Sequence, residues 1–277
     1  MKGHGTMGMP VDASMITPTR NPQAFSEQAT SHASLSSRVR RLLMERFDAS
    51  CAIEVLTRAT GGEIYVVGGA VRRGLLGDRL SGDLDIMIPN GDDRAFQALD
   101  GLKVPFVRNS HGHHRYRWSS LQIDVFQPRE FFHGFEDVET ALGFFDLRIN
   151  ALALHLRSGC ILDPFHLVSP TPVTDPGINW PRWTGMSPLN VVVLAIRLAK
   201  IMHETPELTV SALDALRLRT EVVPRIRECD WSDAQQRFPQ GREEFLRVFD
   251  ATVLGPVRVR ESDRRCRQLH PAPGDAA

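Results

Sequence analysis

The order of apolar and polar residues along the chain predicts helices and strands that follow one another after an N-terminal leader. Apolar residues recur at helical spacing from Ser34 to the pair Gly61-Gly62, where the periodicity stops. The next run, EIYVV, has the length and β-branched content of a short buried strand, and AVRRGLLG predicts a short helix closed by Gly77. In DLDIMI, polar and apolar residues alternate until Pro89, which indicates a second strand.

The rest of the chain continues this mixture and divides into four regions. DDRAFQALDGL predicts a helix, HRYRW and LQIDVFQ predict a hairpin around a Ser-Ser turn, and LNVVVLAIRLAKIMHE predicts a long helix. The long stretch from REFF to LALHL is mixed and partly helical. We therefore expect an α+β fold with four parts: a flexible leader at 1–33, a head domain with a small mixed sheet at 34–168, a proline-rich linker at 169–188, and a short helical domain with a frayed end at 189–277.

Two aspartates on the second strand are the first candidate for chemistry. Asp83 and Asp85 are two positions apart, so their side chains point to the same face of the strand. Two carboxylates side by side repel each other, and Mg²⁺ is a natural partner because it prefers oxygen ligands. A third acid, Asp124, lies on the strand LQIDVFQ, where it could complete a two-metal site. The alternative is a strand end whose aspartates are solvated or paired with nearby arginines.

A glycine pair precedes these acids. Gly68 and Gly69 come where the strand EIYVV turns into a helix, so the backbone can approach a ligand closely and the helix start can face an anion. Arg72, in the first turn of that helix, could add positive charge beside a phosphate. The stretch matches neither the P-loop pattern nor GxGxxG, so the nucleotide-binding classes that carry those motifs are excluded.

Composition adds few constraints. Lys+Arg and Asp+Glu are 33 each, so the formal net charge is zero and any nucleic-acid partner must be held by a local patch. The four cysteines are far apart, without a CxxC pair, which fits a reducing compartment and argues against structural zinc. There is no signal-peptide pattern and no apolar run long enough to span a bilayer. We expect a cytoplasmic protein without a membrane partner.

Several segments together resemble one family. IYVVGGAVRRGLLGDRLSGDLDI resembles the head-domain signature of class II tRNA nucleotidyltransferases and bacterial poly(A) polymerases, with a strand, a glycine pair and a DxD strand. FFDLRINALAL is similar to the family's R-R-D-F-T-x-N-A-L segment, GCILDPF to its strand and D-P-F/Y turn, and SPLNVVVLAIRLAKI, more loosely, to the helix that opens the neck. The resemblance covers about residues 62–202. It implies a small mixed sheet flanked by helices, followed by a helical neck.

The resemblance also implies roles for particular residues. Asp83 and Asp85 would bind two Mg²⁺ ions, and Asp124 stands where the family places an acid on the following strand. The residues that would contact the nucleoside triphosphate are Gly68, Gly69, Arg72, Asp146, Asn150 and, less securely aligned, Arg197.

This chain departs from the family pattern at several of its charged positions. The family's V-R-D aspartate is Arg73 here, and the paired arginines before Asp146 are Phe144 and Phe145; Arg148 could replace one of them. The early arginine of the neck helix is Asn190, and no E-D-x-x-R segment, which selects C and A in the family, is present. The resemblance as a whole supports nucleotidyl transfer, whereas these differences leave CCA addition unsupported.

The segment HGHHRYRW offers candidate acceptor contacts. His113, His114, Arg115 and Arg117 could meet an RNA backbone while the neighbouring aromatic rings stack on bases. The alternatives are a histidine-rich metal loop or a hairpin with one basic, solvated face.

The sequence therefore predicts a metal-dependent nucleotidyltransferase that moves a nucleoside monophosphate from an NTP to an acceptor hydroxyl. An RNA 3′ end is the favoured acceptor. The alternatives are a small-molecule acceptor and a catalytically degenerate head domain that serves as a binding module.

Overall fold

The computed structural model describes residues 29–255, except 78, 81, 109–111, 132–133, 182–187, 229–230, 232–233, 235–237 and 239–240. The side chains of 188–190 also lie outside the description. Most of the expected leader and all of the arginine-rich C-terminal end therefore fall outside it.

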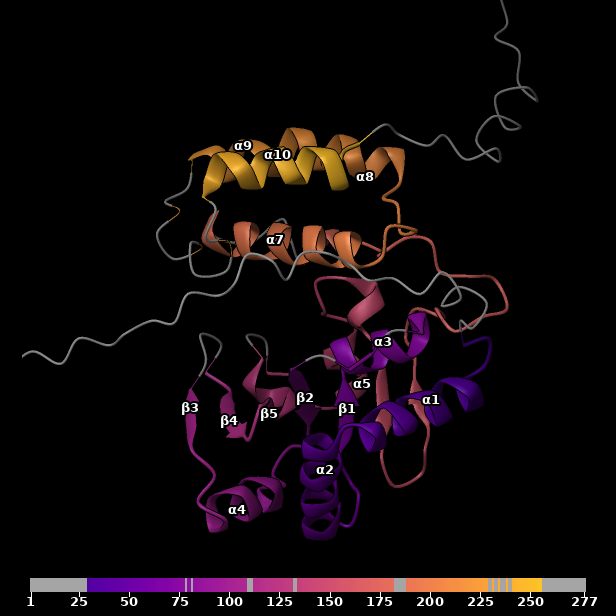
Figure 1. Ribbon diagram of the computed structural model, residues 1–277, viewed down its shortest axis with the longest axis vertical. Helices are drawn as coiled ribbons and strands as arrows, with labels where there is room; N and C mark the ends of the chain where they lie inside the picture. The colour runs from indigo at the N-terminus through magenta and orange to yellow at the C-terminus, as the bar shows by residue number, and fades with distance from the viewer. Residues whose placement is uncertain are drawn as a thin grey trace, which may run out of the picture.

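A seven-stranded mixed sheet forms the first part of the chain, with strand order β3-β4-β5-β2-β1-β6-β7 (Figure 1). The strands are β1 (Tyr65–Val67), β2 (Asp83–Met87), β3 (Phe106–Arg108), β4 (His114–Trp118), β5 (Leu121–Phe126), β6 (Ala153–His155) and β7 (Ile161–Leu162). Only β2 and β5 run parallel, and every other pair of neighbours is antiparallel. This sheet confirms the predicted α+β fold.

Four helices cover one face of the sheet, as the alternation of its apolar residues requires. They are α1 (His32–Glu45), α2 (Phe47–Thr60), α3 (Gly69–Leu76) and α4 (Arg94–Gly101). Leu84 and Ile86 of β2 and Ile123 of β5 are fully buried against them in one hydrophobic cluster. A capping box between Ser31 and Ser34 begins α1, because each side chain accepts a hydrogen bond from the other's backbone N–H.

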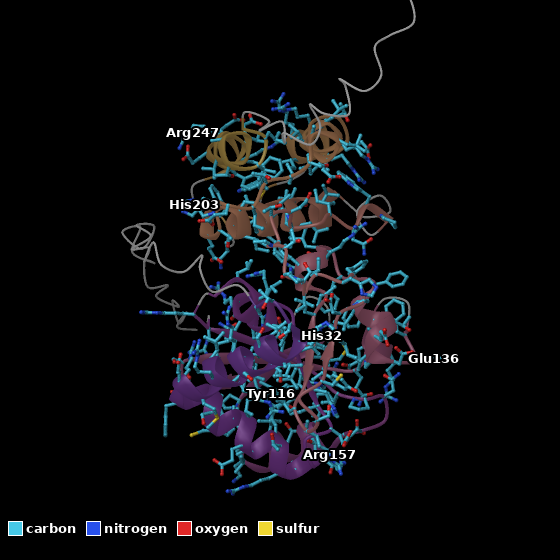
Figure 2. The ribbon with its side chains drawn as sticks, turned by 90° about the vertical axis from the view of Figure 1, so that its right-hand side faces the viewer. His32, Tyr116, Glu136, Arg157, His203 and Arg247 are labelled. Atoms are coloured by element: carbon cyan, nitrogen blue, oxygen red, sulfur yellow. The ribbon has the colours of Figure 1, made fainter. Side chains whose placement is uncertain are left out.

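A smaller apolar cluster lies on the opposite face. It is built around Val67, Met87 and Phe126 of the sheet and includes apolar residues of the short helix α5 (Val138–Leu142). The 3₁₀ turn η3 (Pro128–Glu130) follows β5. The side view in Figure 2 shows Glu136 on the side of the sheet away from α1 and α2. This layer covers only part of the face, because the first residues of β2 on this face are aspartates.

The helical part of the chain is built around α7 (Pro188–Glu204) (Figure 1). The other helices are α8 (Ala212–Arg217), the π-helical turn η5 (Leu218–Val222), α9 (Val223–Glu228) and α10 (Arg242–Thr252). Their apolar faces form a separate hydrophobic cluster. Two residues from the first part of the chain also belong to it: Leu147, just before the 3₁₀ turn η4 (Arg148–Asn150), and Ile149, within that turn.

The predicted elements agree with the structure except at three places. One is β6 (Ala153–His155), which lies in the stretch predicted only as mixed and partly helical. The helical stretch from residue 34 is interrupted at Arg46, whose extended φ of −104° and ψ of 109° separate α1 from α2. Arg46 is held there by a hydrogen bond from its Nε to Asp48 at 2.6 Å. The edge strand β3 was not predicted, because three exposed residues carry no alternation.

The predicted domain boundaries stay predictions, but the proline-rich segment is in contact with both parts of the chain. Ile178 forms an isolated bridge with Leu147 and is buried in the helical cluster. The amide of Asn179 donates to the carbonyls of Gly143 and Phe145, both at 2.9 Å. In the described part of the chain, no helix is long and apolar enough to cross a membrane.

The contact between α1 and α3 leads to a test of the fold. A Cβ on Gly74 would lie 2.5 Å from Cγ2 of Val39 and 3.3 Å from Cδ1 of Leu35. The stiff valine cannot yield easily, so we expect Gly74→Ala to lower the free energy of unfolding by about 1–3 kcal/mol. Urea denaturation measures this. The matched control is Gly101→Ala in α4, where nothing lies within 4 Å; it should be neutral or stabilising by up to about 1 kcal/mol. Equal losses in both variants would contradict this packing.

Candidate active site

Three of the predicted site residues share one face of two neighbouring strands. Asp85 of β2 is in register with Asp124 of β5, and Asp83 is two positions before Asp85 on the same face. On its other side Asp85 pairs with Val67, the last residue of β1, and Asp124 pairs with Arg115 of β4. A single row across the sheet therefore contains an arginine, two aspartates and then apolar residues.

The glycine turn lies against this row. Gly68 has φ of 65° and ψ of −126°, and it joins β1 directly to α3. A Cβ on Gly68 would be only 3.2 Å from Oδ2 of Asp85, so both the positive φ and the close approach require glycine. Gly69, the first residue of α3, has nothing within 4 Å of its own Cβ position. The beginning of α3 and the Asp85 carboxylate are thus adjacent.

The surroundings of the Asp85 carboxyl disfavour its negative charge and raise its pKa. Burial, as the largest cause, and the negative charges of Asp124 and Asp83 raise its pKa to about 7, although Arg197 and Arg115 act in the opposite direction. A carboxyl held in this way is only partly ionised at neutral pH. A cation placed beside it would lower its pKa and stabilise the folded protein.

Asp124 is paired with an arginine. Nε and Nη2 of Arg115 donate to its two carboxylate oxygens, both at 2.7 Å. The Asp124 side chain is 12% exposed and that of Arg115 43%. Asp124 raises the pKa of Arg115, so the guanidinium stays charged. This bidentate geometry is the strongest form of a carboxylate–arginine contact.

Asp146 connects the sheet to the helical part. Its Oδ2 accepts a hydrogen bond from Nη1 of Arg197 in α7 at 2.5 Å, and its Oδ1 accepts one from the backbone N–H of Leu147 at 3.0 Å. The charge of Asp146 is the main cause of the raised pKa of Arg197, and the charge of Asp85 adds to it. Arg197 therefore lies close enough to influence both aspartates.

The other residues predicted to contact the nucleotide are found in two places. Nη1 of Arg72 donates to Oδ1 of Asn150 at 2.6 Å, and both side chains are buried. Arg148 instead lies with its guanidinium carbon 5.3 Å from the ring centre of Phe165. The structure brings Arg72 and Asn150 together, and Arg148 makes a different contact.

The departures from the family pattern have structural explanations. Phe145 lies beside the glycine turn, with a ring carbon 3.8 Å from the Cβ position of Gly68, and its ring stacks at 5.9 Å on Phe131. Phe144 contacts the ring of Phe135 at 4.4 Å. These aromatic side chains extend the smaller apolar cluster up to the site, where the family has cationic side chains.

The hairpin residues do not form one basic patch. His113 is buried and stacks on Phe126 at 4.6 Å, while His114 contacts Phe106 at 5.1 Å on the other side of the strand. Arg115 faces Asp124, and Arg117 is exposed. Tyr116 is one of the neighbouring aromatic residues expected to stack on bases, and for this residue the expectation is wrong, because its side chain is fully buried.

The acidic row offers oxygen donors to a metal ion. Carboxylate oxygens are the donors that Mg²⁺ prefers, and a cation beside Asp85 would offset the burial and the repulsion that raise the pKa of its carboxyl. Within the part of the chain that the structure describes, however, no group of three His, Cys, Asp or Glu side chains is arranged to hold a metal. Asp83 and Asp85 fit Mg²⁺ as a pair, whereas both oxygens of Asp124 are already engaged by Arg115.

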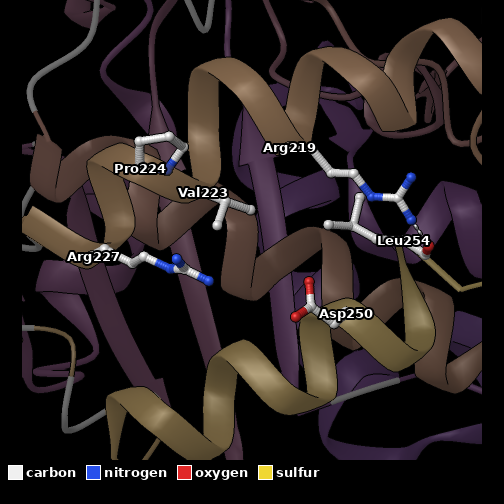
Figure 3. Close-up of a pocket in the computed structure, with 6 residues that line it drawn as sticks. All are labelled: Arg219, Val223, Pro224, Arg227, Asp250 and Leu254. Atoms are coloured by element: carbon white, nitrogen blue, oxygen red, sulfur yellow. Dashed lines mark hydrogen bonds between the residues drawn. The ribbon is translucent and has the colours of Figure 1, made fainter.

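Two surface cavities lie away from this site. One, of about 380 Å³, is in the helical part and is lined by Arg219, Val223, Pro224, Arg227, Asp250 and Leu254 (Figure 3). Arg219 donates there to the carbonyl of Leu254. The other, of about 310 Å³, lies beside Tyr65 and Pro128. Neither is lined by Asp83, Asp85 or Asp124.

Comparison with solved structures identifies the fold. A CCA-adding enzyme in complex with ATP superimposes with a TM-score of 0.53 and 16% identity, over 77% of this chain and 55% of that one. A Thermotoga maritima CCA-adding enzyme complexed with tRNA-CCA gives 0.50 and 19%, over 83% and 53%. A tRNA-processing enzyme complex gives 0.50 and 16%, over 79% and 62%.

These similarities establish the nucleotidyltransferase fold, and at such identities they establish the fold alone. This chain matches between half and two thirds of each solved chain, by the coverages of 55%, 53% and 62%. No model of a protein family matches the sequence, and no curated protein matches it either.

Sequence reasoning assigned Arg115 to the acceptor and so missed its pairing with Asp124. The information was present, because a two-residue turn at Ser119-Ser120 sets the hairpin register and places Arg115 opposite Asp124. The contact between Arg197 and Asp146 spans 51 positions and has no comparable local indication.

The raised pKa of Asp85 predicts how the free energy of unfolding depends on pH. The folded protein holds the Asp85 proton more tightly than the unfolded chain, whose aspartates titrate near pH 4. Asp85 therefore stabilises the fold at low pH, and this contribution is lost as the pH rises through about 7. We compare the free energies of unfolding of Asp85→Asn and the wild type by urea denaturation. The difference between them should shift in favour of the variant by about 1–3 kcal/mol when the pH rises from 4 to 8.

The control for this series is Asp92→Asn. A hydrogen bond from Arg94 lowers the pKa of Asp92, so that group stabilises the fold above its unfolded pKa and loses this effect as the pH falls. Its variant should be less stable than the wild type at neutral pH. If the stabilities of both variants follow the same pH dependence, the pKa of Asp85 is not raised by folding.

Proposed function

We propose that the protein is a nucleotidyltransferase that transfers a nucleoside monophosphate from an NTP to an acceptor hydroxyl. The observation that carries this proposal is the approach of the Gly68 backbone to the Asp85 carboxylate, 3.2 Å from the Cβ position to Oδ2. A triphosphate held at the glycine turn would lie directly beside the acidic strand.

The residues support a division of work. Gly68 and Gly69 offer the start of α3 to the phosphates, and buried Arg72, fixed by Asn150, adds a positive charge behind them. Asp83 and Asp85 would hold Mg²⁺, which neutralises phosphate charge and helps the leaving group when bound. Asp146 would orient the nucleotide together with Arg197.

The reaction follows from these positions. The acceptor oxygen forms a bond to the α-phosphorus, the bond between that phosphorus and the bridging oxygen breaks, and pyrophosphate leaves, while the hydroxyl proton is lost to solvent. The protein's contribution is mainly to position the two substrates and to balance charge, because phosphoryl chemistry needs little covalent help.

An RNA 3′ end is the acceptor we favour, and the cytoplasm is the compartment we expect. Solved structures with this fold are described as CCA-adding enzymes, one with ATP and one with tRNA-CCA. Exposed Arg117 could approach an RNA backbone. A small-molecule acceptor is the second candidate, since the described hairpin residues offer no continuous basic surface.

Transfer is tested with a panel of α-labelled NTPs, Mg²⁺, and either total RNA or a metabolite extract. We expect the wild type to move label to an acceptor and the variants Asp83→Asn and Asp85→Asn to lose at least about 10³-fold in rate, because each removes a carboxylate that balances phosphate charge through the metal.

The matched control is Glu54→Gln, a carboxylate-to-amide change on α2, behind the opposite face of the sheet. It should leave the rate within about twofold of the wild type, as expected for an exposed position remote from the reaction. If the wild type binds no nucleotide, the protein is instead a degenerate head domain and the transferase proposal fails.

The acceptor class is tested by salt. Contacts to several RNA phosphates release counterions, so KM for an RNA acceptor should rise about tenfold or more between 50 and 200 mM salt. A small uncharged acceptor should show almost no change over the same range. An acceptor whose KM is insensitive to salt would contradict the RNA assignment and leave nucleotidyl transfer intact.

A further inference from the structure

Asp124, the third acid of the site, is already paired with a positively charged side chain of the protein, that of Arg115. Asp124 lies beside Asp85 on the parallel strand, yet both of its oxygens accept hydrogen bonds at 2.7 Å from Arg115 on the other neighbouring strand. The three side chains belong to one row of the sheet, so the backbone pairing itself brings the guanidinium to the carboxylate.

This pair differs from an ordinary surface ion pair in two ways. Exposed pairs contribute little because water competes and because long side chains lose freedom. Here Asp124 is only 12% exposed, and the contact is bidentate between residues directly opposite in the ladder. The guanidinium also acts on the neighbouring acids, since the charges of Asp83 and Asp85 contribute to the raised pKa of Arg115.

Two carboxylates of the row then serve a divalent ion. Both oxygens of Asp124 are engaged by Arg115, so Asp83 and Asp85 are the acids of the row whose oxygens a metal would use. Mg²⁺ is commonly bound through one or two carboxylates and keeps several waters, so this pair suits one ion, whereas a second ion would have to displace Arg115 from Asp124.

We propose that Arg115 is the fixed counter-ion of Asp124, so that the protein without nucleotide binds one divalent cation, at Asp83 and Asp85, where three available carboxylates would hold two. The inference rests on the metal site of the proposed function. Arg115 is a positioning residue in this arrangement, because it acts on the metal site through Asp124 and contacts no reacting atom.

The test is the stoichiometry of Mn²⁺ binding, with Mn²⁺ alone as the probe and its unbound fraction followed by electron paramagnetic resonance. We expect one Mn²⁺ per chain for the wild type and two for Arg115→Gln, because the glutamine releases Asp124. Arg117→Gln is the matched control: Arg117 lies on the same strand, two positions on, and is exposed, so one ion should remain.

Changes at Asp124 give an independent measurement. Asp124→Asn should still bind one ion with affinity within about threefold of the wild type, since Asp124 is not a ligand when Arg115 holds it. The double variant Arg115→Gln/Asp124→Asn should return to one ion. Arg115→Lys keeps a positive charge and should also bind one ion. If Arg115→Gln does not fold, Asp124→Asn decides, because loss of the ion in that variant would show that Asp124 is itself a metal ligand.

The possible results distinguish a failure of the role of Arg115 from a failure of the proposed nucleotidyltransferase activity. A wild type that binds two ions, an Arg115→Gln variant that still binds one, or an Asp124→Asn variant that binds none would each overturn the role of Arg115 and leave nucleotidyl transfer standing. A wild type that binds no Mn²⁺ and transfers no nucleotide would overturn both. A wild type that transfers nucleotide without binding Mn²⁺ would overturn the inference alone.

Discussion

Repulsion between two aspartates that face each other across parallel strands is the constraint around which this site is built. Asp85 and Asp124 are in register on β2 and β5, and burial makes the charge of Asp85 more costly. Two arginines from different parts of the chain oppose that charge: Arg115 from the next strand and Arg197 from the helical part. A sheet would not keep such a row for stability, because apolar residues at these positions would pack against Val67 without electrostatic cost.

Much of the site could be predicted from sequence because its information is local. The spacing of Asp83 and Asp85 places them on one face of a strand, and the glycine pair before a helix predicts the turn at Gly68. The apolar alternation also predicts the buried side of the sheet, where Leu84 and Ile123 lie. These inferences need only the period of a strand and the conformational range of glycine.

The contacts that were missed depend on how distant segments meet. Arg73 bonds to Glu204 at 2.9 Å across 131 positions, and Arg197 bonds to Asp146 across 51. No periodicity in either segment indicates the partner. The hairpin is an intermediate case: its short turn determines that Arg115 faces Asp124, but the charged and histidine-rich composition drew attention to a solvent-facing role instead.

The position of Arg73 shows how the helical part contributes to the site. Arg73 directly follows Arg72 in α3. The side chain of Arg72 donates to Asn150, whereas that of Arg73 donates to Glu204 of α7. A second connection joins Asp146 to Arg197 in the same helix. Two ion pairs therefore attach α7 to α3 and to the segment just before η4. Because charge pairs are directional and short-ranged, a displacement of α7 would alter the charge around Asp85 as well as the packing. The helical part is thus an electrostatic component of the site, and a head domain isolated before α7 would lack one of the two arginines that hold down the pKa of Asp85.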